Sequence, residues 1–468
     1  MNNTQCILDA LKIATDTKAF ELGEGVLHRA PALFKEYFPN RKAVIVADNN
    51  TWKAAGEAVD ASMREAGIPC ERFLIEEEEF HADWPYVERI DEMLDRTGAV
   101  AVAVGSGVIN DLCKLASFHH GQSYLCVATA ASVDGYSSSG AVVSRDGAKL
   151  NIETHAPLVI LADVGVLAAA PKEMTAAGYA DLAAKIPAGA EWMIADLFGT
   201  EPIIPAAWNV FMNDLDAMLA DPEGVAAGKP EAIASLFAGL TLSGIAMQVA
   251  KSSRPASGME HQFSHFWDME DLEFEGKHVS HGFKVGIGTL ASTAFLEMLL
   301  DAPVEQLDIE RCVAAWKSWD ETERDIRAIF NDDPEFVARG LKETRDKYVD
   351  REGLRDQLTR LKKAWPELRE RIRRQIIPFD EVRRRLELVG APYEPEQIGV
   401  SRTRFREAFG KIPYMRSRYT VIDTAFRCGW MEEWLDRLFG KGGVWEVGSP
   451  APGSGEPARS AAAPVPGA

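Results

Sequence analysis

The feature that most constrains the fold is a series of short apolar runs in the first third of the chain. The clearest run covers Ala43 to Ala47, and similar runs occur in CERFLI, AVAVAVG, YLCVATA and LVILAD. Helical stretches such as KAAGEAVDASMREAG and residues 86–96 separate them. Strands that are apolar on both faces and alternate with helices are typical of a parallel sheet covered on both sides. Residues 134–152 predict a loop and a small hairpin.

The pattern changes near Pro171. From PKEMTAAGYADLAAK to about Gly440 only helical periodicity is found. We therefore predict an α/β N-terminal nucleotide-binding domain over residues 1–165 and an all-α metal and substrate domain over 166–446. Residues 447–468 are small, Pro-rich and unpatterned, and predict a disordered tail.

Charge and cysteine usage exclude several classes of partner. The chain has 51 basic and 71 acidic residues, a net charge of −20, which argues against nucleic acid or an anionic membrane as the main partner. A local cationic pocket can still bind a small anion. The six cysteines form no CxxC pair, no signal peptide is evident, and the apolar stretch around Asp163 is too short to span a membrane. We expect a cytoplasmic protein without membrane insertion.

A glycine loop follows one predicted strand directly. AVAVGSGVINDLCK places Gly105 and Gly107 between a strand and a helix, where backbone N–H groups can approach a pyrophosphate. Asn110 replaces the third glycine of the dinucleotide-binding pattern, and the candidate acid Asp48 precedes the loop instead of following it. Either this is only a tight turn, or the nucleotide fold is a different one. The loop TAASVDGYSSSG is likewise either ligand-binding or a polar surface loop.

Four of the nine histidines fall between Ser257 and Gly286. His261 and His265 are four residues apart and share a helix face, while His281 opens a further helix. A metal would also need a carboxylate, and Asp181 stands in an apolar run where an unpaired charge is costly. The alternatives are histidines satisfied as ordinary polar groups, and an Asp181 satisfied by backbone amides or by Lys185. An Asp/His/His set leaves an open position on a tetrahedral ion and suits Zn, Ni or Fe.

Five motifs in order, GSGVINDLCK, TAASVDGYSS, GYADLAAK, SRPASGMEHQFSH and HGFKVGIGT, resemble the sn-glycerol-1-phosphate dehydrogenase family. That family belongs to the superfamily of dehydroquinate synthase and iron-containing alcohol dehydrogenases. The segment GAPYEPEQIGVSRTRFREAFGKIPYMRSRYTVIDTAF is similar to its bacterial branch. The resemblance covers residues 20 to 435 and implies a dehydroquinate synthase-like fold, whose nucleotide domain carries its acid before the glycine loop.

The resemblance also implies roles for individual residues. Asp181, His261 and His281 would hold one divalent metal, with His265 and Asp134 facing the substrate. His278 matches no family position and is expected in a loop. The residues implied in binding NAD or NADP are Asp48, Gly105, Ser106, Gly107, Val108, Ile109, Thr129, Ala130, Ala131, Ser132 and Ser138.

Some positions depart from the family pattern. Cys113 stands where a threonine is more usual, and Phe266–Trp267 follows the second histidine where smaller residues are common. The phosphate-binding residues are not readable from the motifs, and Arg254 and Lys251 are only candidates. Asp48 favours NAD over NADP because a carboxylate repels a 2′-phosphate.

The resemblance predicts reversible, metal-dependent reduction of dihydroxyacetone phosphate to sn-glycerol 1-phosphate by NADH or NADPH. The expected partner is thus a small phosphorylated substrate. We also expect a homo-oligomer, with a dimer favoured. The alternatives are a dehydrogenase of another polyol or phosphosugar, a dehydroquinate synthase-like lyase, and a non-catalytic protein that keeps both ligands for structure.

Overall fold

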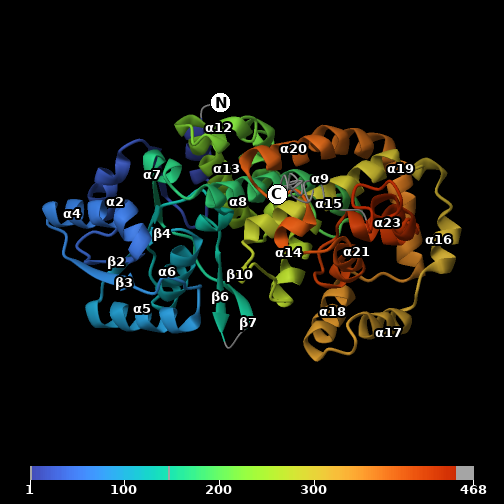
Figure 1. Cartoon of the computed structure of the whole chain (residues 1–468), viewed down its shortest axis with the longest axis horizontal. Coiled ribbons are helices and arrows are strands. Elements are labelled where there is room, and N and C mark those ends of the chain that lie inside the picture. The colour runs from blue at the N-terminus through green and yellow to red at the C-terminus, as the bar shows by residue number, and fades with distance from the viewer. Residues whose placement is uncertain (1–2, 146–147, 449–468) are drawn as a thin grey trace, which may run out of the picture.

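The computed structural model describes residues 3–145 and 148–448 and has two halves (Figure 1). The first half contains a six-stranded parallel sheet in the order β1-β8-β5-β4-β2-β3. The strands of this sheet are β1 (Ala19–Gly23), β2 (Ala43–Asp48), β3 (Cys70–Ile75), β4 (Val100–Gly105), β5 (Leu125–Ala128) and β8 (Val159–Asp163). All five predicted apolar runs are strands, so the prediction of a parallel sheet is confirmed.

Alternate residues of the central strands enter two different cores. Val44 and Val46 of β2 face one core, whereas Ala43, Ile45 and Ala47 face the other. The period of two places successive side chains on opposite sheet faces, and both faces are covered. The helical segments of this half are α1 (Asn3–Leu11), η1 (Val26–Arg29), α2 (Ala30–Tyr37), α3 (Asn49–Thr51), η2 (Trp52–Gly56), α4 (Glu57–Glu65), α5 (Trp84–Thr97), α6 (Gly107–His119) and η3 (Asp134–Tyr136).

The predicted hairpin is present, while two other pairings were not predicted. β6 (Gly140–Arg145) and β7 (Ala148–Glu153) form an antiparallel pair that projects from the sheet (Figure 1). Strand β1 escaped prediction because it is an edge strand whose residues are all half-buried, so its sequence lacks a continuous apolar run. The prediction of only helices after Pro171 was wrong at β9 (Glu273–Phe274) and β10 (Lys277–His278), a two-stranded pair.

The second half is otherwise helical. Its α-helices are α7 (Val164–Ala168), α8 (Lys172–Ala183), α9 (Lys185–Phe198), α10 (Pro205–Phe211), α11 (Leu215–Met218), α12 (Pro222–Ala226), α13 (Pro230–Ala250), α14 (Met259–Met269), α15 (His281–Asp301), α16 (Ile309–Ala315), α17 (Trp319–Ile329), α18 (Pro334–Lys347), α19 (Arg351–Gln375), α20 (Phe379–Val389), α21 (Arg402–Lys411), α22 (Val421–Cys428) and α23 (Met431–Phe439). The short 3-10 segments are η4 (Arg254–Ala256), η5 (Val304–Gln306), η6 (Pro395–Ile398) and η7 (Ile412–Tyr414).

Helices α13 and α15 form the centre of this half. By length and composition alone each could cross a membrane, but 78 % and 89 % of their apolar windows are buried inside the fold. Helices that are apolar on all sides and buried in this way belong to a protein core. The predicted domain boundary at 165/166 falls inside the short helix α7, just after β8, and stays a prediction. The predicted disordered tail lies outside the described residues, apart from residues 447 and 448.

Glycines let the central helices approach closely. A Cβ on Gly282 of α15 would lie 2.1 Å from the carbonyl oxygen of Ala177 on α8. A Cβ on Gly288 of the same helix would lie 2.5 Å from the carbonyl oxygen of Glu260 on α14. Real side chains do not tolerate such distances, so α8 and α14 both depend on these glycines for their position against α15.

Candidate metal and nucleotide site

Three side chains from three helices converge at the middle of the molecule. Asp181 is near the end of α8, His261 is in the first turn of α14, and His281 is the first residue of α15. One ligand atom from each lies within 4.8 Å of the other two. The fold therefore brings together residues that are 20 and 80 positions apart in the chain.

The imidazoles are oriented by residues of α14. The Nδ1 atom of His261 lies 2.9 Å from Oε1 of Glu260, and the Nδ1 atom of His281 lies 3.2 Å from Oγ of Ser264. With Nδ1 engaged, Nε2 of each ring is the atom left for an ion. Nε2 of His261 lies 3.8 Å from Oδ1 of Asp181. Sequence reasoning missed the roles of Glu260 and Ser264, although both are neighbours of His261 in the same helix.

Asp181 is fully buried and has three kinds of neighbour. Its Oδ1 accepts a hydrogen bond from Nζ of Lys185 at 2.6 Å, and its Oδ2 accepts one from the backbone N–H of Asp134 at 2.9 Å. The Asp181 carboxylate therefore accepts hydrogen bonds from both predicted alternative partners, Lys185 and a backbone amide. It also faces the imidazoles. A carboxylate offers about four lone-pair sites, so these bonds leave room for a cation.

Lys185 joins Asp181 to the second candidate carboxylate. Its Nζ atom also lies 3.0 Å from Oδ2 of Asp134, which accepts a further hydrogen bond from Oγ of Ser243 at 3.0 Å. Burial disfavours the charged form of Lys185, but Asp134 and Asp181 outweigh this and raise its pKa. The side chains of Asp134 and Asp181 are thus bridged by one buried cation.

The histidines are held in their neutral form. Burial is the main cause that lowers the pKa of His261, His265 and His281, and the charge of Lys185 lowers that of His261 further. Neutral imidazole is the form that binds metals. Two neutral imidazoles and a carboxylate in a buried site therefore fit a divalent transition metal, and this donor set does not distinguish Zn, Ni and Fe.

His265 lies beside this group. Its ring centroid is 6.3 Å from that of His261, one turn earlier in α14, whereas the rings of His261 and His281 are 5.2 Å apart. It is not among the three side chains that approach a common point in the described part of the chain. His265 is therefore in a position to contact a ligand bound where Asp181, His261 and His281 converge.

The carboxyl ends of β2 and β4 carry the candidate nucleotide residues. The strand order reverses between these two strands, because β3 lies on one side of β2 while β4 and β5 continue on the other. In open α/β sheets ligands bind outside the carboxyl ends of strands at such a reversal. Asp48 ends β2 and Gly105 ends β4, so both lie at this position.

The glycine loop is a tight turn at the place where a nucleotide would bind. A Cβ on Gly105 would lie 2.5 Å from Cβ of Ile109, so only glycine allows α6 to start here. The N–H of Thr129 donates to the carbonyl oxygen of Gly105 at 3.1 Å, which ties the next loop to the first. The loop is therefore a tight turn, and this geometry is compatible with backbone N–H groups facing a pyrophosphate at α6.

The remaining candidate nucleotide residues differ in whether their side chains or only their backbone atoms are accessible to a ligand. Asp48 is the N-cap of α3 and accepts hydrogen bonds from Asn50 and Thr51. Gly107 begins α6 after the N-cap residue Ser106, and Ser138 donates to the carbonyl oxygen of Gly135 at 3.2 Å. Half-buried side chains are those of Val108 and Ser132, while those of Ile109, Ala130 and Ala131 are buried and leave only backbone atoms for a ligand.

The nucleotide loop and the metal helix are in contact. A Cβ on Gly178 of α8 would lie 1.9 Å from the carbonyl oxygen of Ala131. The same loop continues to Asp134, whose N–H binds Asp181. Gly178 therefore sets the distance between the two parts of the site.

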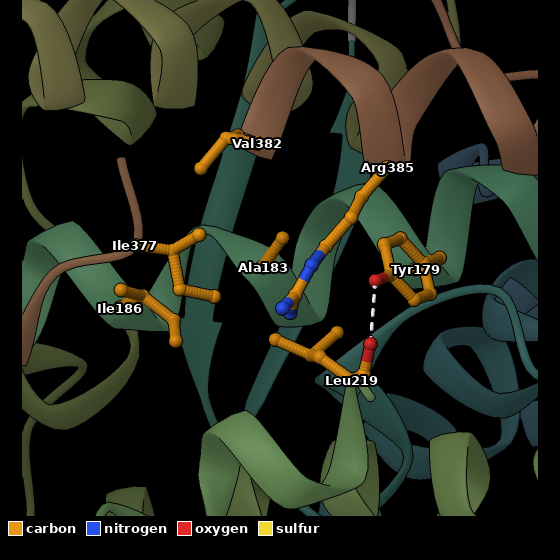
Figure 2. A pocket seen from close by; sticks show the side chains of 7 residues that line it. All are labelled: Tyr179, Ala183, Ile186, Leu219, Ile377, Val382 and Arg385. Carbon is orange, nitrogen blue, oxygen red and sulfur yellow. Dashed lines mark hydrogen bonds between the residues drawn. The ribbon is translucent and has the colours of Figure 1, made fainter. Parts of the chain in front are cut away.

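Two other features lie outside this site. His278, expected in a loop, is on strand β10 and forms an exposed group with Asp271 and Glu273. A cavity on the other side of α8 has a volume of about 10 Å³, barely enough for one water (Figure 2). Figure 2 shows Arg385 reaching over it, with Oη of Tyr179 donating to the carbonyl oxygen of Leu219 at 2.7 Å.

Comparison with solved structures defines the class of the fold. Glycerol dehydrogenase from Schizosaccharomyces pombe superposes with a TM-score of 0.57 at 15 % identity, covering 91 % of this chain and 92 % of that one. A probable glycerol dehydrogenase from Sinorhizobium meliloti gives 0.56 at 14 % identity, covering 90 % and 98 %. Residues 21–171 also match the family described as iron-containing alcohol dehydrogenase. The chain thus has the two-part fold of these dehydrogenases, as predicted.

Curated relatives define the family more narrowly. Three of them, all named NAD(P)+-linked glycerol-1-phosphate dehydrogenases, come from Halalkalibacterium halodurans, Pyrococcus horikoshii and Bacillus licheniformis. They are 34 %, 33 % and 31 % identical over 280, 270 and 294 residues, which cover 58 %, 58 % and 62 % of this chain and 69 %, 75 % and 73 % of the relatives. The chain belongs to the glycerol-1-phosphate dehydrogenase family of oxidoreductases.

Proposed function

We propose that this protein catalyses the reversible reduction of dihydroxyacetone phosphate to sn-glycerol 1-phosphate with NADH or NADPH. The observation that carries the proposal is the convergence of Asp181, His261 and His281 within 4.8 Å, next to the loop that follows β5. The names of the curated relatives support the substrate and the cofactor. One divalent ion, Zn, Ni or Fe, is proposed at these three side chains.

The two bound groups would supply the chemistry that side chains lack. An ion at this site polarises a carbonyl as a Lewis acid, and a reduced nicotinamide is the hydride donor. The protein contributes position and charge. Glu260 and Ser264 direct the Nε2 atoms of the two imidazoles, and Lys185 bridges the Asp181 and Asp134 side chains beside the place of reaction.

The loops that follow β4 and β5 would hold the cofactor in a fixed position. Gly105 allows α6 to begin at the end of β4, and Thr129 ties the following loop to it, so the backbone there is rigid before a ligand arrives. A fixed dinucleotide turns an encounter into a positioned transfer. Through Gly178 the same loops are packed on α8, so a dinucleotide held by these loops would adjoin the helix that carries Asp181.

A proton must reach the product oxygen, and His265 is the proposed relay. It is a neutral imidazole one turn from His261, and a neutral imidazole can pass its N–H proton to the product oxygen as its other ring nitrogen takes a proton from solvent. Asp134, held by Ser243 and Lys185, is placed to accept a hydrogen bond from a substrate hydroxyl.

The test is an assay of the purified protein after chelation and after addition of Zn, Ni or Fe. We expect reduced nicotinamide to be consumed with dihydroxyacetone phosphate only in the metal-loaded protein, and chiral analysis to identify sn-glycerol 1-phosphate. Full turnover by a demonstrably metal-free Asp181→Asn, His261→Ala double variant would refute the proposal.

The same assay distinguishes the alternatives. A lyase of the dehydroquinate synthase kind gives no net consumption of NADH, and a substrate panel identifies a preference for another polyol or phosphosugar. Tight NAD binding without turnover of any small ketone would indicate a non-catalytic protein. The cytoplasmic location and the homo-oligomer stay predictions, and light scattering measures the latter.

A further inference from the structure

Three arginines from two distant segments meet beside α14. Arg254 is in η4, while Arg416 and Arg418 lie between η7 and α22. The guanidinium of Arg418 donates to the carbonyl oxygen of Ser257 at 2.9 Å and to Oγ of Ser253 at 3.2 Å, which joins the two segments.

Arg254 has no hydrogen-bond partner although it is buried. Its side chain is 3 % exposed, and none of its three guanidinium nitrogens makes a hydrogen bond to the described residues. Its closest carboxylate oxygen, Oε2 of Glu201, is 3.5 Å from Nε. Burying an unpaired cation costs several kcal/mol, so such a group is retained where a ligand completes its bonds.

Carboxylates surround this cluster without completing its hydrogen bonds: Glu201, Glu191 and Glu260 lie near Arg254, and Glu343 lies near Arg416. Nε of Arg418 lies 3.4 Å from Oε1 of Glu201, so Glu201 is shared by Arg254 and Arg418. Arg416 is half-buried and makes no hydrogen bond or ion pair with the described residues. Burial and then the charges of Arg418 and Arg339 lower its pKa to about 10, so it stays charged at neutral pH.

The cluster adjoins the candidate catalytic side of α14. The backbone carbonyl oxygen of Arg418 accepts a hydrogen bond at 3.3 Å from Nε2 of Gln262, the residue after His261. Arg416 is the charged group that most affects His265. The segment of Arg416 and Arg418 is therefore bonded to α14 one residue after His261, and the charge of Arg416 is close enough to act on His265.

We propose that Arg254, Arg416 and Arg418 form an anion subsite that binds the phosphate of the substrate. The inference rests on the proposed function, since it supplies the phosphate recognition that the motifs do not reveal. Guanidinium groups match phosphate oxygens in paired, charge-assisted hydrogen bonds, which would use the open donors of Arg254 and Arg416. Arg416 forms the open edge of the subsite and Arg254 its buried end. Such a pocket attracts an anion despite the net charge of −20.

The test compares a phosphorylated and an unphosphorylated ketone in Arg416→Gln and Arg254→Gln. Loss of a charge-assisted hydrogen bond costs about 1.5–3 kcal/mol, so we expect KM for dihydroxyacetone phosphate to rise roughly 10- to 150-fold. The kcat/KM for dihydroxyacetone and the Kd for NADH should stay within about twofold of wild type, because neither ligand carries the phosphate that these arginines bind. Arg360→Gln removes an exposed arginine of α19 and is the matched control.

Direct binding separates this inference from the proposed function. Inorganic phosphate should bind the metal-loaded wild type in calorimetry and bind Arg416→Gln at least tenfold more weakly. If the wild type binds phosphate in this way but does not reduce dihydroxyacetone phosphate, the proposed function fails and the subsite stands. If the wild type turns the substrate over and both variants keep its KM, the subsite is refuted. Should Arg254→Gln fail to fold, Arg416→Gln alone decides, because Arg416 has no internal bond to lose.

Discussion

The two halves of the molecule build their parts of the site in different ways. Asp48 and Gly105 are the last residues of the adjacent strands β2 and β4. Their main contacts are with residues close in sequence: Asp48 accepts hydrogen bonds from the first residues of α3, and Gly105 packs against Ile109. In the helical half, Asp181, His261 and His281 come from three helices, so the contacts among these three side chains are tertiary. The loops at the carboxyl ends of the strands are thus formed by residues that are close in sequence. The metal site, in contrast, exists only when α8, α14 and α15 are packed together.

This comparison predicts that single changes in the helical half have the largest effects. His281→Ala removes one of three ligands, and we expect loss of the bound metal and a fall in kcat/KM of roughly 10³-fold or more, because Lewis-acid assistance is worth several kcal/mol. Metal analysis and steady-state kinetics measure both. His278→Ala, three residues away in the exposed β10, is the control and should keep metal and activity. Equal losses in the two variants would contradict the assignment of the site.

The buried histidines also predict how the metal-free protein responds to acid. Burial lowers the folded-state pKa of His261, His265 and His281 below the roughly 6.5 of free imidazole. As pH falls through about 6.5, the unfolded chain binds protons that the folded chain does not, so stability is present above this pH and is lost below it. Each such group costs about 1.4 kcal/mol per pH unit. Denaturant unfolding at pH 7 and pH 5.5 measures the loss, and a pH-independent free energy of unfolding would contradict it.

The contact between the two halves is predicted to be sensitive to volume. Gly178→Ala places a methyl group 1.9 Å from the carbonyl oxygen of Ala131, so α8 must shift away from the loop after β5. We expect a loss of about 1–3 kcal/mol in the free energy of unfolding and weaker NADH binding. Gly410→Ala in α21 has nothing within 4 Å and should be neutral or stabilising. If NADH binding is unchanged in Gly178→Ala, the two parts of the site are less coupled than this contact implies.

A substitution at the carboxyl end of β2 is expected to have the smallest effect on activity. Asp48→Asn keeps an N-cap for α3 but removes the negative charge that opposes a 2′-phosphate. The ratio of kcat/KM for NADH over NADPH should fall by about fivefold or less, since a partly solvated charge contributes no more than about 1 kcal/mol. Parallel kinetics with both cofactors test this. An increased preference for NADH would show that the Asp48 carboxylate does not face the ribose.

The sequence was a good guide where structure follows from neighbouring residues. The strands β2, β4, β5 and β8 are readable because burial on both faces leaves a continuous apolar run, while the half-buried edge strand β3 is marked by Phe73, Leu74 and Ile75. The edge strand β1 and the short pair β9 and β10 are half-buried or exposed, so no such run marks them. Arg416 and Arg418 lie in a segment with no chemical motif of its own, and only their packing against Ser253 and Ser257 brings them to the site.

The sequence by itself determined the α/β half, the tight turn at Gly105 and the types of residue available for a metal, because each depends on local patterns of apolar, small and ligating side chains. Only the tertiary structure decided that Ser264 of α14 orients His281 of α15, that Lys185 joins Asp181 to Asp134, and that Arg254 is buried without a hydrogen-bond partner in the described part of the chain. These relations depend on distances between segments far apart in the chain, and helix packing fixes such distances through small residues such as Gly282 and Gly288.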